Sequence, residues 1–166
     1  RPDKESKSYY RNSFSCMPAS RPARSLLPPP RPIVRGAQTA LVVGPEGQEI
    51  HTDKFGRIRI QFPWDRYGTR NERSSCFVHV AQPIAGDGWG MMFLPRIGME
   101  VVVHFLDGDP DRPLVTGAIY NGTNAPPWAL QTDMTKSGIL SRSTPSGTSA
   151  NANELSFDDK KGAEMV

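Results

Sequence analysis

Cysteine is scarce in this sequence, and long apolar runs are absent. Only two of the 166 residues are cysteine, Cys16 and Cys76, and they lie 60 positions apart. This spacing excludes a disulfide framework and a paired-cysteine metal motif, so we expect two reduced thiols. No stretch of about 18 apolar residues occurs, which excludes a transmembrane helix. The first ten residues are polar, and we expect no signal peptide.

Helical periodicity is also lacking, whereas proline and glycine are abundant. The sequence holds 16 prolines and 15 glycines, about 19% of the chain against a usual ~12%. Only 37% of the residues are hydrophobic. This composition favours short strands joined by turns over amphipathic helices, so we expect an all-β fold.

Positive charge is confined to the N-terminal part of the chain. Residues 1–36 hold eight Lys/Arg and two Asp/Glu, a net charge of +6. Residues 37–166 hold twelve Lys/Arg and fifteen Asp/Glu, a net charge of −3. A nucleic-acid-binding domain concentrates positive charge on its folded surface in order to neutralise phosphates. This sequence does the opposite.

Residues 37–121 contain five apolar segments typical of strands, enough for one modest core. In 57–62, Ile58, Ile60 and Phe62 alternate with polar residues, which predicts one apolar face and one polar face. Glycine and proline turns separate the segments. The predicted strands are 39–43, 57–62, 76–81, 100–106 and 114–120, with a short irregular strand at 91–94. Five short strands without a helix predict a small barrel or sandwich.

The segments on either side of this barrel have no core of their own. Seven of the prolines fall within residues 1–36. We predict a lone strand at 9–14 there, and an extended polyproline spacer at 27–33. Residues 122–152, rich in Ser, Thr, Gly and Pro, are predicted as a surface linker. In residues 153–166 we predict a hairpin whose strands, 153–157 and 163–166, flank a turn.

Short motifs follow one another along the chain in a distinctive order. They run from Val42-Val43-Gly44-Pro45 through Trp64-Asp65-Arg66 and Gly88-Trp89-Gly90 to Gly108-Asp109-Pro110-Asp111-Arg112-Pro113, and then to Asn153-Glu154-Leu155 and Asp159-Lys160-Lys161-Gly162. In this order, and over nearly the whole chain, they resemble the valine-glycine repeat protein G (VgrG) family. These are the spike-tip proteins of bacterial type VI secretion, and they are similar to the tail spikes of contractile phages.

The resemblance implies a structural spike component that punctures target membranes and carries effectors, not an enzyme. Residues 1–36 would be the end of a hub domain plus a linker, and 37–121 an oligonucleotide/oligosaccharide-binding (OB) barrel. Residues 153–166 would be the first turn of a trimeric β-prism. The implied partners are two further copies, a stacked tube protein, a tip-sharpening PAAR-repeat protein, effector or adaptor proteins, and a membrane contacted mechanically. The implied localisation is cytoplasmic during assembly, then secreted into the target cell or medium.

Eight residues are predicted to support the barrel or the contacts between subunits. Arg112 is expected to pair with Asp107, with Asp109 or with a carboxylate of a neighbouring subunit. Leu155 and Phe157 point to one face of a strand, and three chains around an axis would bury that face, whereas one chain cannot. The full set is Arg57, Arg59, Trp64, Trp89, Asp109, Arg112, Leu155 and Phe157.

Signals for catalysis or metal binding are weak. Asp107–Asp111 resembles the start of a calcium loop, but the positions that need Gly and Glu hold Arg112 and Ala118, so we expect a tight turn. The three histidines occur in no ligand-spacing motif. The Ser-Ser-Cys sequence at 74–76 lacks a nucleophile elbow and an adjacent base. We predict no catalytic residue, no metal and no cofactor.

The alternative function is an OB-fold nucleic-acid-binding module. Arg57 and Arg59 point away from the apolar face and could meet phosphates, but Phe62 lies on the core side. Residues 37–121 carry eight Lys/Arg against ten Asp/Glu, so we expect no nucleic acid as a partner. Trp64 and Trp89 lie in turn-rich segments, where an indole is expected to fill a barrel end or a subunit contact.

Overall fold

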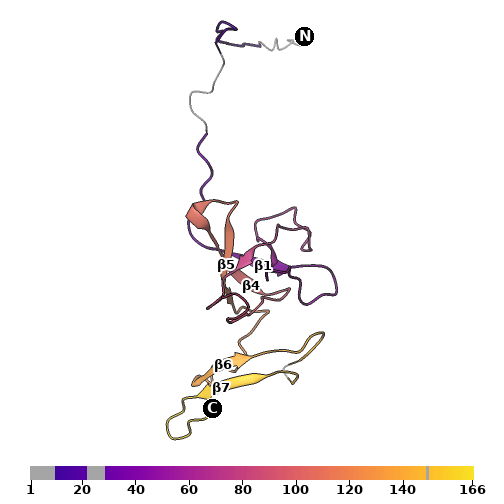
Figure 1. Cartoon of the computed structure of the whole chain (residues 1–166), viewed down its shortest axis with the longest axis vertical. Coiled ribbons are helices and arrows are strands. Elements are labelled where there is room, and N and C mark those ends of the chain that lie inside the picture. The colour runs from indigo at the N-terminus through magenta and orange to yellow at the C-terminus, as the bar shows by residue number, and fades with distance from the viewer. Residues whose placement is uncertain (1–9, 22–28, 149) are drawn as a thin grey trace, which may run out of the picture. The chain divides into compact units, whose positions relative to one another are not determined.

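The computed structural model describes residues 10–21, 29–148 and 150–166, and these are almost entirely β structure and loop (Figure 1). The chain divides into two units, residues 1–31 and 32–166. In the first unit, the described residues form one turn, in which the Arg21 amide donates to the Pro18 carbonyl at 3.0 Å. The strand predicted at 9–14 is wrong over the described residues 10–14, because a lone strand has no partner for its hydrogen bonds. Tyr9 and residues 27–28 of the predicted spacer lie outside the described residues.

A five-stranded sheet forms the centre of the second unit, with the strand order β2-β1-β4-β5-β3. The β1 strand pairs antiparallel with β2 and β4, β4 pairs antiparallel with β5, and β3 runs parallel to β5. Each strand lies within about two residues of a predicted one or inside it. The strands are β1 (Gln38–Val43), β2 (Arg59–Gln61), β3 (His79–Val80), β4 (Glu100–Phe105) and β5 (Pro113–Ile119).

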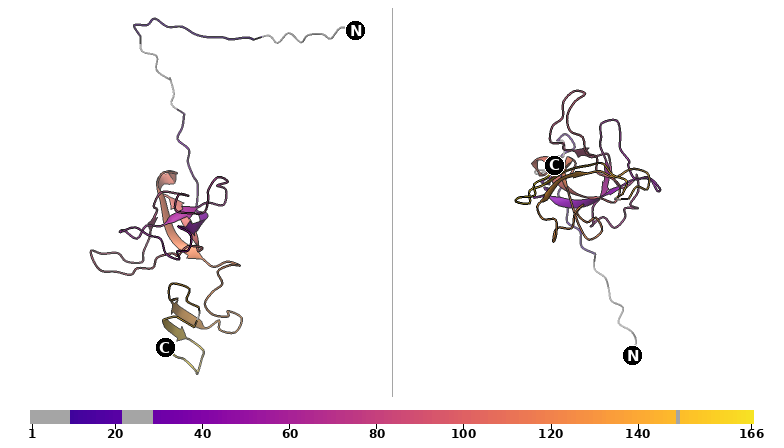
Figure 2. Two further views of the ribbon diagram at one scale, coloured as in Figure 1. Left: turned by 90° about the vertical axis from the view of Figure 1, so that its right-hand side faces the viewer. Right: turned by 90° about the horizontal axis from the view of Figure 1, so that it is seen from below.

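One pair of residues joins the two edges of this sheet. The Ile58 amide donates to the Val78 carbonyl at 3.0 Å, and the Val78 amide donates to the Ile58 carbonyl at 2.8 Å. Because Ile58 directly precedes β2 and Val78 directly precedes β3, the pair curls the sheet on itself (Figure 2). The result is the expected five-stranded, partly open barrel, in which neither edge strand is left free along its whole length.

The core inside this sheet is made almost entirely of β-branched residues. Ile58 and Ile60 are at most 1% exposed, and Phe62 packs against the same cluster, which confirms the predicted alternation. β-Branched side chains fit a pleated surface because their restricted rotamers are already compatible with strand geometry. The buried cluster comprises Ala40, Val42, Ile58, Ile60, Val78, Val101, Val103 and Val115.

The chain between β4 and β5 turns tightly, as predicted. A short 3-10 turn, η1 (Leu106–Gly108), places Asp107 and Gly108 at φ of 58° and 73°, the left-handed region that reverses a chain within few residues. The strand predicted at 91–94 is wrong. The Phe93 amide donates to Gln82 Oε1 at 2.9 Å, and the Gln82 side-chain amide donates to the Phe93 carbonyl at 3.0 Å. The Gln82 side chain therefore occupies the Phe93 amide and carbonyl, the two groups that would otherwise pair with a neighbouring strand.

A separate two-stranded ribbon follows the barrel in sequence. It pairs β6 (Lys136–Leu140) antiparallel with β7 (Glu154–Asp158). The stretch 122–152, predicted as a linker, therefore contains a strand, and the predicted pairing of 153–157 with 163–166 is wrong. Only Met165 bridges to Asp158 there. The β6 sequence, KSGIL, has two apolar residues and a glycine, so it carries almost no alternation for a pattern to detect.

Gln61 was expected on the polar outer face of its strand but is only 8% exposed. The loop after β2 folds over it. The Gln61 Oε1 atom accepts hydrogen bonds from the Arg70 amide at 2.7 Å and from the Ser74 hydroxyl at 2.9 Å, and the side-chain nitrogen donates to the Asp65 carbonyl at 3.3 Å. One side chain thus fixes a loop that spans residues 65–74.

We predict that Gln61→Leu destabilises this loop and the barrel. Leucine keeps most of the side-chain volume but leaves the Arg70 amide and the Ser74 hydroxyl without their acceptor, a loss of about 1–3 kcal/mol in the free energy of unfolding. Urea denaturation measures it, with Gln48→Leu at an exposed position as the control. Equal stability of the two variants would show that Gln61 does not hold the loop.

Candidate functional site

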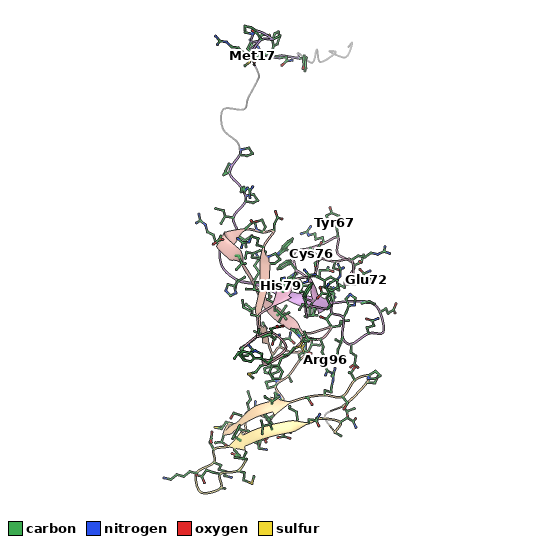
Figure 3. The ribbon with its side chains drawn as sticks, in the orientation of Figure 1. Met17, Tyr67, Glu72, Cys76, His79 and Arg96 are labelled. Atoms are coloured by element: carbon green, nitrogen blue, oxygen red, sulfur yellow. The ribbon has the colours of Figure 1, made fainter. Side chains whose placement is uncertain are left out.

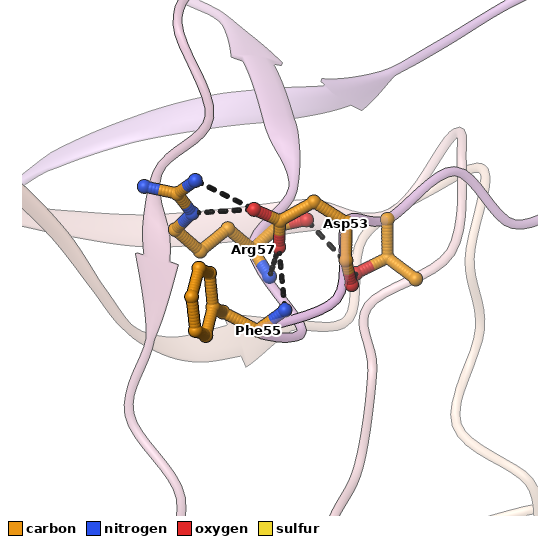
Figure 4. Close-up of polar contacts among 4 residues, drawn as sticks. Asp53, Phe55 and Arg57 are labelled. Atoms are coloured by element: carbon orange, nitrogen blue, oxygen red, sulfur yellow. Dashed lines mark hydrogen bonds and ion pairs between the residues drawn. The ribbon is translucent and has the colours of Figure 1, made fainter.

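The turn before β2 is organised by one carboxylate, that of Asp53 (Figure 4). Its Oδ1 atom accepts hydrogen bonds from the amides of Phe55 and Arg57, both at 3.0 Å. Its Oδ2 atom accepts from the Arg57 guanidinium, at 2.7 Å from Nε and 2.6 Å from Nη2. Donation by the Arg57 side chain, together with the two amides, lowers the pKa of Asp53 to about 2.

Arg57 and Arg59 lie over the aromatic rings of the same region rather than extending freely into solvent. The Arg59 guanidinium is 4.2 Å from the centre of the Phe77 ring and donates from Nη1 to the Ser75 carbonyl. Arg57 lies 5.9 Å from the same ring and 5.3 Å from the ring of Phe55. Cation–π contacts of this kind, added to the Asp53 pair, engage both guanidinium groups within the chain.

The two tryptophans named by the sequence lie in separate surroundings. Trp64 stacks on Phe62, with ring centres 5.0 Å apart, and its indole nitrogen donates to Gln38 Oε1 at 2.9 Å. Trp89 belongs to a loop closed by the Ala85–Gly90 bridge, and its ring covers Gly86, where a Cβ would come within 2.2 Å of the indole. Both indoles remain about two-thirds exposed. Their predicted contacts with other subunits stay predictions.

Arg112 pairs with Asp107 across the β4–β5 turn, at 3.0 Å between Nη1 and Oδ2. The Asp109 carboxylate instead accepts from the Asp111 amide at 3.0 Å and does not pair with the Arg112 guanidinium. The Asp109 carbonyl accepts from the Arg112 backbone amide at 2.9 Å, so Asp109 shapes the turn through both its side chain and its backbone. The side chains of Arg112 and Asp107 are 53% and 87% exposed, and an exposed pair of this kind contributes only ~0–1 kcal/mol. The pair is therefore a small term in the stability of a single chain.

Leu155 and Phe157 lie on β7 and share one face of the ribbon. The register sets Leu155 opposite Ile139 on β6, and Phe157 opposite Ser137. Leu155, Phe157 and Ile139 are 55%, 43% and 42% exposed. The ribbon therefore presents an apolar face that the described residues of this chain leave uncovered.

The described residues bring together no arrangement typical of a catalytic or metal centre. None of their His, Cys, Asp and Glu side chains form groups of three or more that could hold a metal ion. A pocket of about 260 Å³ beside Gln61 has Asp65 and Glu100 among its lining residues. Asp65 Oδ1 accepts from two backbone amides, and Glu100 Oε2 accepts from the Asn121 side chain at 2.6 Å, so structural hydrogen bonds engage both. No helix in the described part of the chain is long and apolar enough to cross a membrane.

The eight predicted residues do not form one cluster. They fall into separate groups instead: Arg57 and Arg59 share Phe77, Asp109 and Arg112 share the β4–β5 turn, and Leu155 and Phe157 share β7. Sequence reasoning missed several polar residues that hold loops in place, among them Gln61, Glu49 and Arg96. A polar residue within an alternating strand could have indicated Gln61. The other two bind backbone atoms 97 and 46 positions away, and no local pattern reports such a distance.

We predict that the Asp53 carboxyl titrates near pH 2 in the folded chain, well below its ordinary value of about 3.9. Because its pKa is lowered on folding, the carboxylate stabilises the fold fully above about pH 4, and this contribution is lost as the pH falls towards 2. Carbon-detected NMR titration measures the midpoint. Arg57→Gln should raise it towards the ordinary value, and an unchanged midpoint would show that Arg57 is not the cause.

Comparison with known proteins gives a consistent assignment. Residues 39–120 match the family described as the type VI secretion system/phage-baseplate injector OB domain. Over 159 residues, 96% of this chain, the sequence is 50% identical to the type VI secretion system spike protein VgrG1a of Pseudomonas aeruginosa. It is 50% identical over 157 residues to VgrG1b of the same organism. It is also 48% identical over 157 residues to a Vibrio cholerae protein named actin cross-linking toxin VgrG1.

The matched region is a small part of each of these relatives. This chain covers 25% of the length of VgrG1a, 21% of VgrG1b and 14% of the actin cross-linking toxin. The family match coincides with the curled sheet described above, from β1 to the end of β5. The sheet topology, the family match and the identity over nearly the whole chain agree, and the chain therefore belongs to the VgrG family, with its OB domain at residues 39–120.

Proposed function

We propose that this chain is the collar segment of a type VI secretion spike, in which the OB barrel connects a preceding hub to a following needle. The observation that carries the proposal is identity of 46–50% over at least 95% of the chain to four Pseudomonas proteins named as spike proteins. The curled sheet, whose two edges are joined by the Ile58–Val78 pair, supports it, since a collar that transmits force has to be stiff. Stiffness follows from backbone pairing that leaves few free edges.

The same segment occurs in relatives with different printed roles, which argues for a shared mechanical part. Relatives named as spike proteins and the relative named as an actin cross-linking toxin match the same stretch of this chain at similar identity. A segment common to both is best assigned to what they share. We therefore assign the segment to the spike scaffold, with no catalytic role and no cofactor.

The proposal includes assembly into a homotrimer, in which two further copies cover the apolar face of the ribbon. Leu155 and Phe157 are partly exposed in the single chain, and burying such a side chain contributes ~1.5–3 kcal/mol. The other proposed partners are a tube protein below the hub, a PAAR-repeat protein at the tip, and effector or adaptor proteins. The assembled needle would form in the cytoplasm and be driven mechanically through a target membrane.

We predict that changing Leu155 and Phe157 to Asp abolishes trimers while the barrel stays folded. The two carboxylates would have to be buried at the proposed axis without partners, which costs more than the ribbon contacts supply. Light scattering of the longer protein that contains this segment measures the mass, and its secretion by a bacterium carrying the apparatus measures the function.

The matched control places the same charges at exposed apolar positions outside both strands of the ribbon, as Leu130→Asp with Met134→Asp. The control should remain trimeric and be secreted normally. A double variant at 155 and 157 that still forms trimers would show that assembly depends on another part of the protein. Normal secretion of a monomeric variant would overturn the spike proposal itself.

We also predict that the chain does not bind single-stranded DNA through Arg57 and Arg59. Both guanidinium groups are engaged by Asp53, Ser75 and aromatic rings, and the barrel carries more carboxylates than cations. Fluorescence anisotropy of a labelled oligonucleotide at low salt should be unchanged by Arg57→Gln with Arg59→Gln. A micromolar complex that this double variant weakens would favour the nucleic-acid alternative.

A further inference from the structure

After β5 the chain leaves the sheet, and two asparagine side chains then hold it to the barrel within a few residues. The Asn124 side chain donates to the Gly98 carbonyl at 2.9 Å, and the Asn121 side chain donates to Glu100 Oε2 at 2.6 Å. The Asn124 carbonyl also accepts the Asn121 amide at 2.9 Å, which closes a tight turn. This first attachment lies before β6 in the sequence.

A second attachment lies after β6. The backbone amide of Ser146 donates to Glu49 Oε1 at 2.7 Å, and Arg96, labelled in Figure 3, donates from Nη2 to the Arg142 carbonyl at 2.7 Å. Glu49 and Arg96 both lie within the barrel domain, residues 39–120. Hydrogen bonds with one charged partner are stronger than neutral ones, so both contacts are of the strong class.

The Glu49 and Arg96 side chains also face each other. Their closest charged atoms, Oε2 and Nη1, lie 3.9 Å apart, and the side chains are 26% and 21% exposed. These two atoms are buried and have no hydrogen-bond partner among the described residues, so the attraction between them is electrostatic. The hydrogen bond from Ser146 is also the main cause that lowers the pKa of Glu49.

The backbone beneath this pair is itself fixed. The Ile97 amide donates to the Glu49 carbonyl at 3.0 Å, and the Ile97 side chain lies so close to Gly44 that a Cβ there would be 2.5 Å from its Cδ1 atom. Glu49 and Arg96 therefore extend from two chain segments that cannot shift independently. Such a base is needed if side chains are to hold a loop in one position.

We propose that Glu49 and Arg96 form a latch that holds the segment 142–146 against the barrel, so that β6 is tied to the barrel at both of its ends. The asparagine turn at 121–124 holds the chain to the barrel before β6, and the latch at 142–146 holds it directly after β6. The ribbon is then oriented by side chains as well as by the covalent chain. Its use in passing load from collar to needle rests on the proposed function, whereas the latch itself does not.

Amide exchange measured by NMR on the whole chain tests the latch directly. Glu49→Ala removes the acceptor of the Ser146 amide, and its exchange should become at least about tenfold faster, because a hydrogen bond to a charged group is lost. Glu46→Ala changes an exposed glutamate of the same loop and should leave that rate unchanged. The Val101 and Val103 amides, in the buried part of β4, report whether the barrel remains folded.

Trypsin tests the other half of the latch, because it cleaves at the Arg142 carbonyl that Arg96 holds. Arg96→Met should speed cleavage after Arg142 relative to cleavage after Lys160 and Lys161, which lie in the turn that follows β7. Arg66→Met, at an exposed arginine without a described side-chain bond, is the matched control. Arg96→Lys keeps the charge but cannot serve both partners with one planar group, and should give an intermediate rate.

An unchanged Ser146 exchange rate in Glu49→Ala, or unchanged cleavage at Arg142 in Arg96→Met, would overturn the proposal. If Glu49→Ala failed to fold, Arg96→Lys with the trypsin readout would still decide it. None of these measurements needs an oligomer or secretion. The latch and the spike function can therefore fail separately, and the result identifies which of them failed.

Discussion

The backbone pair between Ile58 and Val78 is the contact on which the arrangement of the barrel depends. It joins the segments that lead into the two edge strands, β2 and β3, which are three and two residues long. Strands this short cannot hold a sheet together by ladder bonds alone. Closure adds two hydrogen bonds where the ladder is weakest, and it places both side chains in the core, where they are at most 2% exposed. The same closure brings Arg57 and Arg59 beside Phe77, because these residues flank the joined positions.

The loops of this barrel are held by polar side chains that bind backbone groups. Asp53 holds the turn before β2, Gln61 the loop after it, Gln82 the base of the loop that ends at Phe93, and Glu49 the segment around Ser146. In each case a carboxylate or amide takes backbone amides that would otherwise meet water or remain unpaired. A barrel with short strands thereby obtains ordered loops.

Much of the barrel was predictable because its signals are local. The alternation of Ile58, Ile60 and Phe62, and the apolar runs around Val42 and Val102, are visible within six residues. The family resemblance then supplied the OB fold, which the comparisons confirm.

Where prediction failed, the decisive partner lay far away in the sequence. The β6 strand is defined by its pairing with β7, not by its own pattern, and the buried state of Gln61 depends on a loop that folds back over it. Contacts between a side chain and backbone atoms far away in the sequence cannot be predicted from a local residue pattern. The trimeric prism and the subunit contacts of the site residues stay predictions.

The paired hydrogen bonds between Gln82 and Phe93 have a consequence for how this domain can diversify. The Gln82 side-chain amide uses one of its N–H groups as a donor and its oxygen as an acceptor, and a neighbouring strand residue would offer the same two kinds of group, so the base of the loop is closed as it would be by strand pairing. The ten residues between them lie beyond that closure. Residues can be inserted or deleted there while the base stays closed, and the register of the barrel strands is then preserved. The length and sequence of this loop can thus change during evolution, or a peptide can be grafted into it, without disturbing the packing of the barrel core.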